Sequence, residues 1–148
     1  MINYSKLVEI RWSDLDPNFH VRHSVYYDFG AFVRMSFLTA NGLDASVLLQ
    51  HHLGPILFRE ECQFKREIHF GDEVSIDLVL KQASPNYSRW TFQHHIYKNK
   101  ETLAAIITVD GAWLDTNRRR LTIPTEVVRP SFELLPKAED FIWIERSK

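Results

Sequence analysis

The chain has 148 residues, with 18 lysines and arginines against 19 acidic residues and a single cysteine. This length suits one domain, assigned to residues 1–148, that buries its core without disulfides. The net charge of -1 offers no electrostatic attraction to nucleic acid or to an anionic membrane. Cys62 alone supplies neither an internal disulfide nor a thiolate zinc cluster. We find no signal-peptide pattern and no membrane-length apolar run, so we expect a soluble, cytoplasmic protein.

The first third of the chain predicts a strand followed by a helix. Apolar and polar residues alternate from Tyr4 to Trp12, which predicts a half-buried strand. Ser24 is a suitable N-cap for a helix that Asn41-Gly42 ends. Helical spacing relates Val25, Phe29, Phe32, Val33, Ser36 and Ala40. Phe37 and Leu38 make this helix apolar on more than one side, so we expect other elements to wrap it.

From residue 53 onward the pattern has a period of two, which predicts strands. One predicted strand places Ile56, Phe58, Glu60, Cys62 and Phe64 on one face. Further strands are predicted over 73–82, 88–97 and 102–114, with a turn at 84–86 and a hairpin loop at 98–101. Gly111 predicts a bulge or a close backbone approach, and a short helix or irregular tail follows Pro124.

This order of elements predicts an α+β fold. One strand and one long apolar helix precede four strands joined by short turns, which implies an antiparallel sheet. A long antiparallel sheet wrapped around one central helix would bury that helix on several sides. The alternative is a cone-shaped ligand-binding fold, although folds of that type usually open with helices.

The stretch WSDLDPNFHVRHSVYY, residues 12–27, concentrates polar side chains before the helix. Its Asp14-x-Asp16-x-Asn18 spacing suits a calcium loop, but that loop needs a glycine and an acid where Phe19 and Val25 stand. A metal held by His20 and His23 would lack companions at a known spacing. We therefore expect no metal site. The pairs His51-His52 and His94-His95 are interpreted as surface or packed histidines.

Two interpretations of this stretch remain. Aspartate, asparagine and proline form turns, and the carboxylates can bond to backbone amides. However, the loop leads into a helix N-terminus, where free amides favour developing negative charge. Asp16, Asn18 and His20 also supply the groups that activate water against a polarised carbonyl.

Two motifs carry a resemblance to a known family. SDLDPNFHVRHSVYYDF, residues 13–29, resembles the strand-to-helix segment of hotdog-fold acyl thioesterases, both the 4-hydroxybenzoyl-CoA thioesterase-like and the acyl-ACP thioesterase-like branches. FKREIHFGDEV, residues 64–74, is similar to the family's Tyr-x-Arg-Glu followed by Gly-Asp-Glu. The resemblance extends to about residue 115, and it implies the hotdog fold.

The resemblance also implies roles. Asp16 would be the catalytic general base or nucleophile, with Asn18 and His20 positioning the water or the carbonyl and Glu67 as a second carboxylate. Backbone amides near His23 and Ser24 would polarise the thioester oxygen, and Tyr26 would line the acyl pocket. Such hydrolysis requires neither a metal nor an organic cofactor.

Some residues depart from the family pattern or allow two interpretations. Arg22-His23 replaces the usual Asn-Asn, so His20 and His23 both remain candidates for the imidazole role. Phe19 replaces a glycine and would narrow the site. Glu60, on an apolar face, is either a functional carboxylate with a raised pKa or a mark of a strand end or local bulge.

We therefore expect an acyl-CoA thioesterase. Hydrolysis of acyl-ACP and a non-catalytic acyl-binding hotdog protein are the alternatives. The family pairs its sheets into dimers, often four copies in total, with active sites at the subunit interface. Exposed sheet edges favour such pairing independently, so we expect a homodimer or homotetramer.

Overall fold

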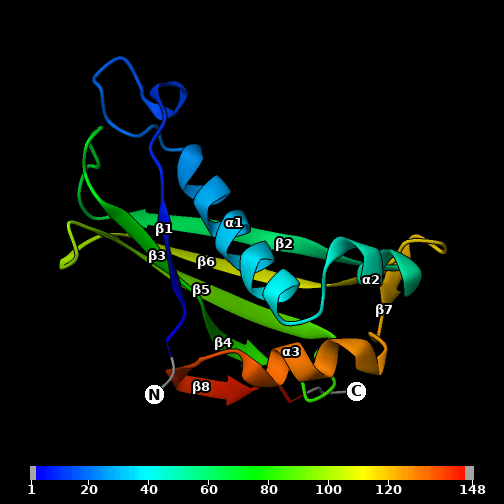
Figure 1. Cartoon of the computed structure of the whole chain (residues 1–148). Coiled ribbons are helices and arrows are strands. Elements are labelled where there is room, and N and C mark those ends of the chain that lie inside the picture. Colours follow the sequence, from blue (N-terminus) through cyan, green and yellow to red (C-terminus); the bar gives the residue numbers. More distant parts are fainter. Residues whose placement is uncertain (1–2, 146–148) are drawn as a thin grey trace.

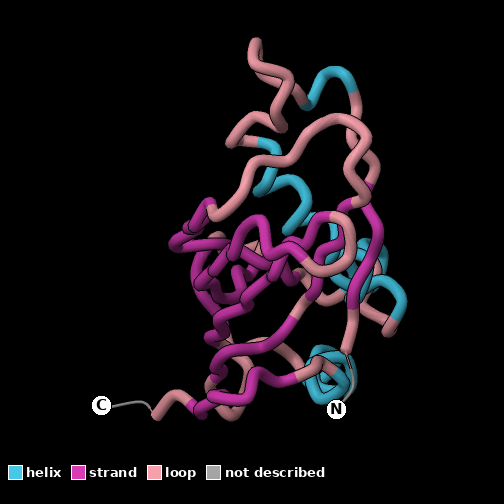
Figure 2. Tube along the Cα trace, turned by 90° about the vertical axis from the view of Figure 1, so that its left-hand side faces the viewer, coloured by secondary structure: helices cyan, strands magenta, loops and turns pink. Residues whose placement is uncertain are grey.

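The structure is a computed structural model that describes residues 3–145. Its long helix lies across one face of a large sheet, and a view turned by 90° shows the helices gathered on that side (Figures 1 and 2). The strands are β1 (Ser5–Val8), β2 (Leu53–Phe64), β3 (Val74–Asp77), β4 (Val79–Ala83), β5 (Arg89–Lys98), β6 (Thr102–Asp115), β7 (Arg120–Thr122) and β8 (Lys137–Trp143). The helices are α1 (Val25–Ala40), α2 (Ala45–Gln50) and α3 (Arg129–Leu134), with 3-10 turns η1 (Trp12–Asp14) and η2 (Glu126–Val128).

The sheet is built around β5. On one side β5 pairs with β6, which pairs in turn with β2 and β7. On the other side it pairs with β3, whose neighbour is β1, and with β4, whose neighbour is β8. These pairings are antiparallel except for β4 with β8. The predicted antiparallel sheet with a central helix is confirmed.

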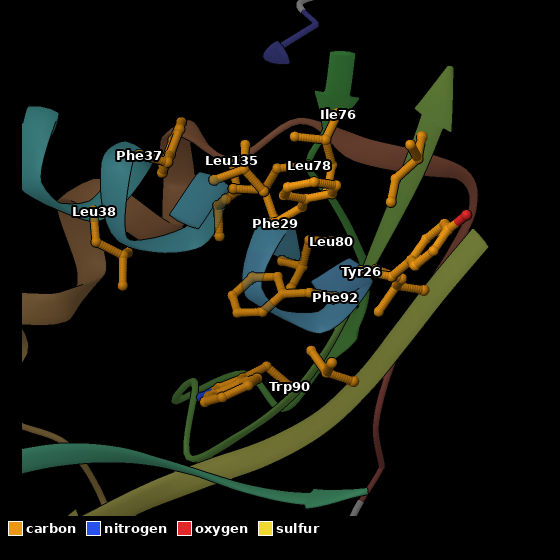
Figure 3. Close-up of a cluster of buried hydrophobic side chains, with 14 of the residues drawn as sticks. Tyr26, Phe29, Phe37, Leu38, Ile76, Leu78, Leu80, Trp90, Phe92 and Leu135 are labelled. Atoms are coloured by element: carbon orange, nitrogen blue, oxygen red, sulfur yellow. The ribbon is translucent and has the colours of Figure 1, made fainter. Parts of the chain in front are cut away.

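The core lies between α1 and the sheet (Figure 3). The buried side chains of α1 are Val25, Tyr26, Phe29, Gly30, Val33, Arg34, Phe37 and Leu38. The predicted stripe was wrong in part, because Phe32 is 45% exposed and Ala40 is also exposed. Because the sheet covers only one side of α1, the buried stripe includes Phe37 and Leu38 and leaves out Phe32 and Ala40.

The predicted first strand is shorter in the structure. β1 ends at Val8, and Trp12 lies in the 3-10 turn η1. The carboxylate of Asp14 accepts a hydrogen bond from the backbone N–H of Arg11 at 2.9 Å. This local bond turns the backbone, where the alternation of side chains predicted an extended chain.

The predicted strand over 73–82 divides into β3 and β4 at Leu78. The backbone N–H of Leu78 donates to the carbonyl of Tyr4 at 3.1 Å and joins neither strand. The break lets β3 pair with β1 while β4 pairs with β8.

β2 contains a local bulge, one of the interpretations given for Glu60 on an apolar face. Its register against β6 shifts between Leu57 and Arg59, which leaves Phe58 as the extra residue of a bulge. Before the bulge Ile56 pairs with Ala112, whereas after it Glu60 pairs with Val109, so these two residues lie on opposite faces, contrary to prediction. The guanidinium of Arg89 lies 4.9 Å from the ring of Phe58.

Gly111 of β6 stands opposite this bulge. A Cβ atom there would collide with the ring of Trp90 and with the carbonyl of Ile56. The predicted close backbone approach is confirmed.

The predicted turns are confirmed, but the tail is more ordered than predicted. Residues 84–88 join β4 to β5, and residues 99–101 join β5 to β6. After Pro124, α3 buries Phe132 against aromatic rings of the sheet, and β8 extends the sheet beyond β4. Within residues 3–145, no helix is long and apolar enough to cross a membrane.

Candidate active site

The loop between η1 and α1 lies at one end of the molecule, beside the connection from β2 to β3 (Figure 1). Leu15 and Val21 form an antiparallel bridge within the loop. The N–H of Val21 donates to the carbonyl of Ile68 at 2.8 Å, and His20 bridges His69. These bonds join the two predicted motifs, which lie about fifty residues apart in sequence.

Asp16 combines a turn-forming role with an available oxygen. Its Oδ1 accepts hydrogen bonds from the backbone N–H groups of Asn18 at 2.9 Å and His20 at 3.1 Å. Its Oδ2 takes part in neither bond. The turn interpretation of this residue is therefore correct, yet it leaves half of the carboxylate for chemistry.

His20 is paired with the second predicted carboxylate. Its Nε2 lies 3.1 Å from Oε2 of Glu67. The same Oε2 lies 3.8 Å from Nε2 of His69, and the two imidazole rings are 4.7 Å apart between centroids. The side chain of His20 is 28% exposed, so this imidazole is reachable from solvent.

An open cavity of about 320 Å³ brings most of the predicted residues together. Its lining residues are Asp16, His20, Val21, His23, Tyr26, Phe64, Lys65, Arg66 and Glu67. Both imidazole candidates, His20 and His23, reach it. The cavity therefore joins two carboxylates, two imidazoles and two cations.

Asn18 and Ser24 lie outside this lining. Asn18 is exposed and contributes its backbone N–H to Asp16. Ser24 occupies the predicted N-cap position of α1, but its side chain makes no capping hydrogen bond. The N-terminus of α1 still adjoins the cavity through His23 and Tyr26, so the positive end of the helix dipole is close to the carboxylates.

Tyr26 forms an inner wall. Its ring packs edge-on against Phe64 with centroids 5.0 Å apart, and its hydroxyl lies at the edge of the core cluster (Figure 3). Burial raises the pKa of Tyr26 to about 12, with smaller contributions from Cys62, Asp16 and Glu67. The phenol therefore stays protonated at neutral pH and can donate a hydrogen bond.

A second polar centre lies beneath the middle of α1. Nη1 of Arg34 is 2.9 Å from Nε2 of His94, and Nδ1 of His94 is 2.8 Å from the carbonyl of Asp77. Because arginine only donates, Nε2 of His94 accepts and Nδ1–H donates to Asp77. Nη2 of Arg34 lies 3.9 Å from the carboxylate of Glu60.

Burial shifts the pKa of each member of this centre. It lowers the pKa of Arg34 and, together with the nearby Arg34 charge, lowers the pKa of His94 to about 3. It raises the pKa of Glu60, against the opposing effect of Arg34. The packed-histidine interpretation of His94 is confirmed, and the neighbouring His95 points to the other face, where it pairs with Asp77 at 2.9 Å.

Sequence reasoning missed several of these residues. His69 lies in the second motif, residues 64–74, two positions after Glu67. In an extended segment this spacing places both side chains on the same side, which could have indicated that they act together. Lys65 and Arg66 precede Glu67 in the same motif. Arg34 is a cation within the apolar part of the predicted helix, which could have indicated a buried ion pair.

Comparison with known proteins identifies the family of the chain. The family model described as the thioesterase-like superfamily matches residues 10–131. A relative from Aquifex aeolicus, whose name provisionally calls it an esterase, is 24% identical over 119 residues, which cover 80% of this chain and 90% of the relative.

Solved structures show the same fold. A Staphylococcus aureus protein solved in complex with CoA superposes with a TM-score of 0.82 at 17% identity, over 89% of this chain and 82% of the other. A 1,4-dihydroxy-2-naphthoyl-CoA thioesterase from Synechocystis gives a TM-score of 0.79 at 16% identity, over 90% and 97%. The chain therefore belongs to the thioesterase-like superfamily, a family of thioester hydrolases with the hotdog fold.

Proposed function

We propose that this protein hydrolyses acyl-CoA thioesters to the free acid and CoA, with Asp16 as the central residue. The observation that supports this most directly is the cavity at the N-terminus of α1, which joins Asp16 to the His20–Glu67 pair. One oxygen of Asp16 is held by two backbone amides, so the other has a fixed direction. A fixed, accessible carboxylate beside an imidazole is suited to general-base catalysis.

In the proposed reaction, Oδ2 of Asp16 removes a proton from water as the water oxygen attacks the thioester carbonyl carbon. The carbonyl oxygen becomes an oxyanion, which the N-terminal amides of α1, near His23 and Ser24, stabilise. The carbon–sulfur bond then breaks, and the CoA thiolate takes up the proton. Asp16 could instead attack the carbon itself, and water would then hydrolyse the resulting anhydride.

The other residues position these groups. His20 and Glu67 would hold the water or the carbonyl, and Tyr26 would line the acyl pocket. Asn18 would act through its backbone N–H, which fixes Asp16. The reaction as proposed needs no cofactor.

CoA is preferred over acyl carrier protein as the carrier. Lys65 and Arg66 line the cavity and offer two cations for the phosphates of CoA. The net charge of -1 gives no overall electrostatic attraction to an acidic carrier protein. The CoA complex of the Staphylococcus aureus structure and the substrate of the Synechocystis enzyme agree with this choice.

We also propose a homodimer that pairs through β2, with a homotetramer as the larger assembly. In the described part of the chain β2 pairs only with β6, so its other edge is open. Three large apolar side chains along it are exposed: Leu57 at 41%, Phe58 at 51% and Phe64 at 53%. Because Phe64 lines the cavity, such pairing would place the site at the subunit interface. A monomer of 17.5 kDa by light scattering would contradict this proposal.

The decisive experiment is thiol release from short-chain, long-chain and aromatic acyl-CoAs by the wild type and Asp16→Asn. We expect one class to turn over and the variant to lose that turnover. Asp140→Asn is the matched control, because it removes a surface carboxylate on β8, at the opposite end of the molecule. If the same acyl group were released from acyl carrier protein but not from CoA, the proposal that CoA is the carrier would be wrong.

One observation favours a second function. The two amide bonds to Asp16 would form the same turn in a protein that only binds acyl groups. Acyl ligand retained through purification, with no thiol released from either carrier, would select this function and reject hydrolysis.

A further inference from the structure

We propose that His20, Glu67 and His69 form a zinc site, and that Zn²⁺ bound there inhibits the enzyme. We call these three residues the zinc triad. The sequence offered His20 no metal-ligating companion at a known spacing. The fold supplies two companions from the connection between β2 and β3.

The distances within the zinc triad suit a small cation. One ligand atom from each residue lies within 4.8 Å of the other two. Oε2 of Glu67 is 3.1 Å from Nε2 of His20 and 3.8 Å from Nε2 of His69. In a tetrahedral zinc site with bonds of about 2.0–2.2 Å, neighbouring ligand atoms are about 3.3–3.6 Å apart. Modest side-chain rotations of Glu67 and His69, both more than half exposed, would close the site around an ion.

The backbone brings the zinc triad together before any ion binds. His20 and His69 face each other across an antiparallel bridge, and the adjacent Val21 N–H bonds to Ile68 at 2.8 Å. Folding therefore already places the three ligands close together, so little further ordering of the chain is needed when an ion binds.

Asp72 provides an outer carboxylate for His69. Its Oδ2 accepts the backbone N–H of His69 at 2.8 Å and lies 3.9 Å from Nδ1 of the ring. Zinc-bound histidines usually donate their second ring N–H to a carboxylate, which fixes the ring and raises its basicity. At 3.9 Å this hydrogen bond is not formed, and a small rotation of the exposed His69 ring would bring Nδ1 into range.

The ligand types select the metal. Two imidazoles and one carboxylate suit Zn²⁺ and disfavour Mg²⁺ and Ca²⁺, which prefer oxygen ligands. Lys65 and Arg66 line the same cavity and weaken binding by repulsion. We therefore expect reversible binding that chelators remove.

Inhibition follows from which atoms the ion would take, and this part rests on the proposed function. Zn²⁺ would occupy the lone pair on Nε2 of His20 and the carboxylate of Glu67. These are the groups proposed to position the water or the thioester carbonyl. His69 has no part in that reaction, so its substitution separates metal binding from catalysis.

Binding is tested by calorimetry on chelator-treated protein without a histidine tag, titrated with Zn²⁺, and by the visible absorption of Co²⁺ as a substitute. We expect one Zn²⁺ per chain, no comparable binding of Mg²⁺, and affinity at least about tenfold lower in His69→Gln. His52→Asn is the matched control, because it removes an exposed imidazole from residue 52, outside the zinc triad, and asparagine tolerates the positive φ of 54°. Equal affinity in the wild type and His69→Gln would overturn the site.

Inhibition is tested by adding Zn²⁺ to the thiol-release assay and then EDTA. The wild type should lose turnover and regain it with EDTA, whereas His69→Gln should resist the same Zn²⁺ concentration. Activation by Zn²⁺ would overturn the inhibitory role. If no thioester is cleaved at all, the proposed hydrolysis fails, and calorimetry still decides whether the site exists.

Discussion

Two polar centres adjoin α1, and they use similar residues for different purposes. The cavity at its N-terminus joins Asp16, His20 and Glu67, whereas the centre beneath its middle joins Arg34 and His94. The side chain of Glu67 is 65% exposed, but His94 is fully buried. Both ring nitrogens of His94 have protein partners, at 2.8 and 2.9 Å.

The comparison shows that residue type alone does not identify a reactive group. A buried imidazole with both nitrogens bonded has no lone pair for a substrate, and its pKa of about 3 keeps it neutral. Asp16, by contrast, has one oxygen outside its turn bonds and lines an open cavity. We therefore expect substitutions in the first centre to change turnover and those in the second to change stability.

The largest expected effect is on turnover in Asp16→Asn. We expect kcat/KM to fall by about 10²–10⁴-fold, the usual contribution of general-base catalysis. The amide oxygen of asparagine can still accept the N–H groups of Asn18 and His20, so the free energy of unfolding should change by less than about 0.5 kcal/mol. Steady-state kinetics and urea unfolding measure the two quantities. A large loss of stability in this variant would show that Asp16 has a structural role, and the two centres would then not differ as proposed.

The next effect is on stability in Arg34→Met. Methionine keeps much of the side-chain volume but removes the donor to Nε2 of the buried His94. An unsatisfied buried acceptor costs about 1–3 kcal/mol, and we expect a loss of this size in the free energy of unfolding. Glu60 adds little, because its side chain is 26% exposed and stays hydrated. Unchanged urea unfolding would show that water replaces the guanidinium and that the centre contributes no stability.

The third effect is a change in the pH dependence of stability. The folded pKa of His94, about 3, lies below its unfolded value of about 6.5, so the unfolded chain binds the extra proton between these values. Stability therefore falls as pH drops below about 6.5, by up to about 1.4 kcal/mol per pH unit. His94→Gln should flatten this acidic slope in urea unfolding between pH 4 and 6.

The neighbouring His95 has the opposite effect. Its hydrogen bond to the Asp77 carboxylate raises its pKa, despite burial. The stability it adds is present below the unfolded pKa of about 6.5 and is lost as pH rises through the folded value. His95→Gln should therefore flatten the alkaline side only. A profile in which either variant changes the other side would contradict the assignment of the two histidines to opposite environments.

The fold could largely be predicted from sequence, because local periodicity encodes its elements, whereas the accessible centre was indicated by the two motifs that resemble the thioesterase family. The helix from Val25 to Ala40 and the long antiparallel strands follow from periodicity, and the motifs around Asp16 and Glu67 indicated the cavity. The bulge at Phe58 could not be placed, because it depends on Gly111 of a strand fifty residues away. One extra residue there placed Ile56 on the opposite face from Glu60, where the period of two had predicted the same face.

The buried centre was not predicted, because its partners meet only through tertiary packing. Arg34 lies on α1, while His94 comes from β5 and Glu60 from β2. The strand β8 was missed for a similar reason, since it pairs in parallel with β4 across a long connection. Local propensity contains no information on such pairings.

The smallest expected effect, in Gly30→Ala, tests how tightly the buried centre is packed. Alanine within a helix gains about 0.5–1 kcal/mol over glycine. A Cβ at this position would lie 3.1 Å from Nη1 of Arg34 and 3.2 Å from Cδ2 of His94, which strains their hydrogen bond. The two effects oppose each other, so we expect a net change below about 1 kcal/mol and of destabilising sign. In an Arg34→Met background the guanidinium contact is gone, and the same substitution should become less destabilising or stabilising in urea unfolding. If Gly30→Ala had the same effect in both backgrounds, the guanidinium would not be the group that requires glycine here.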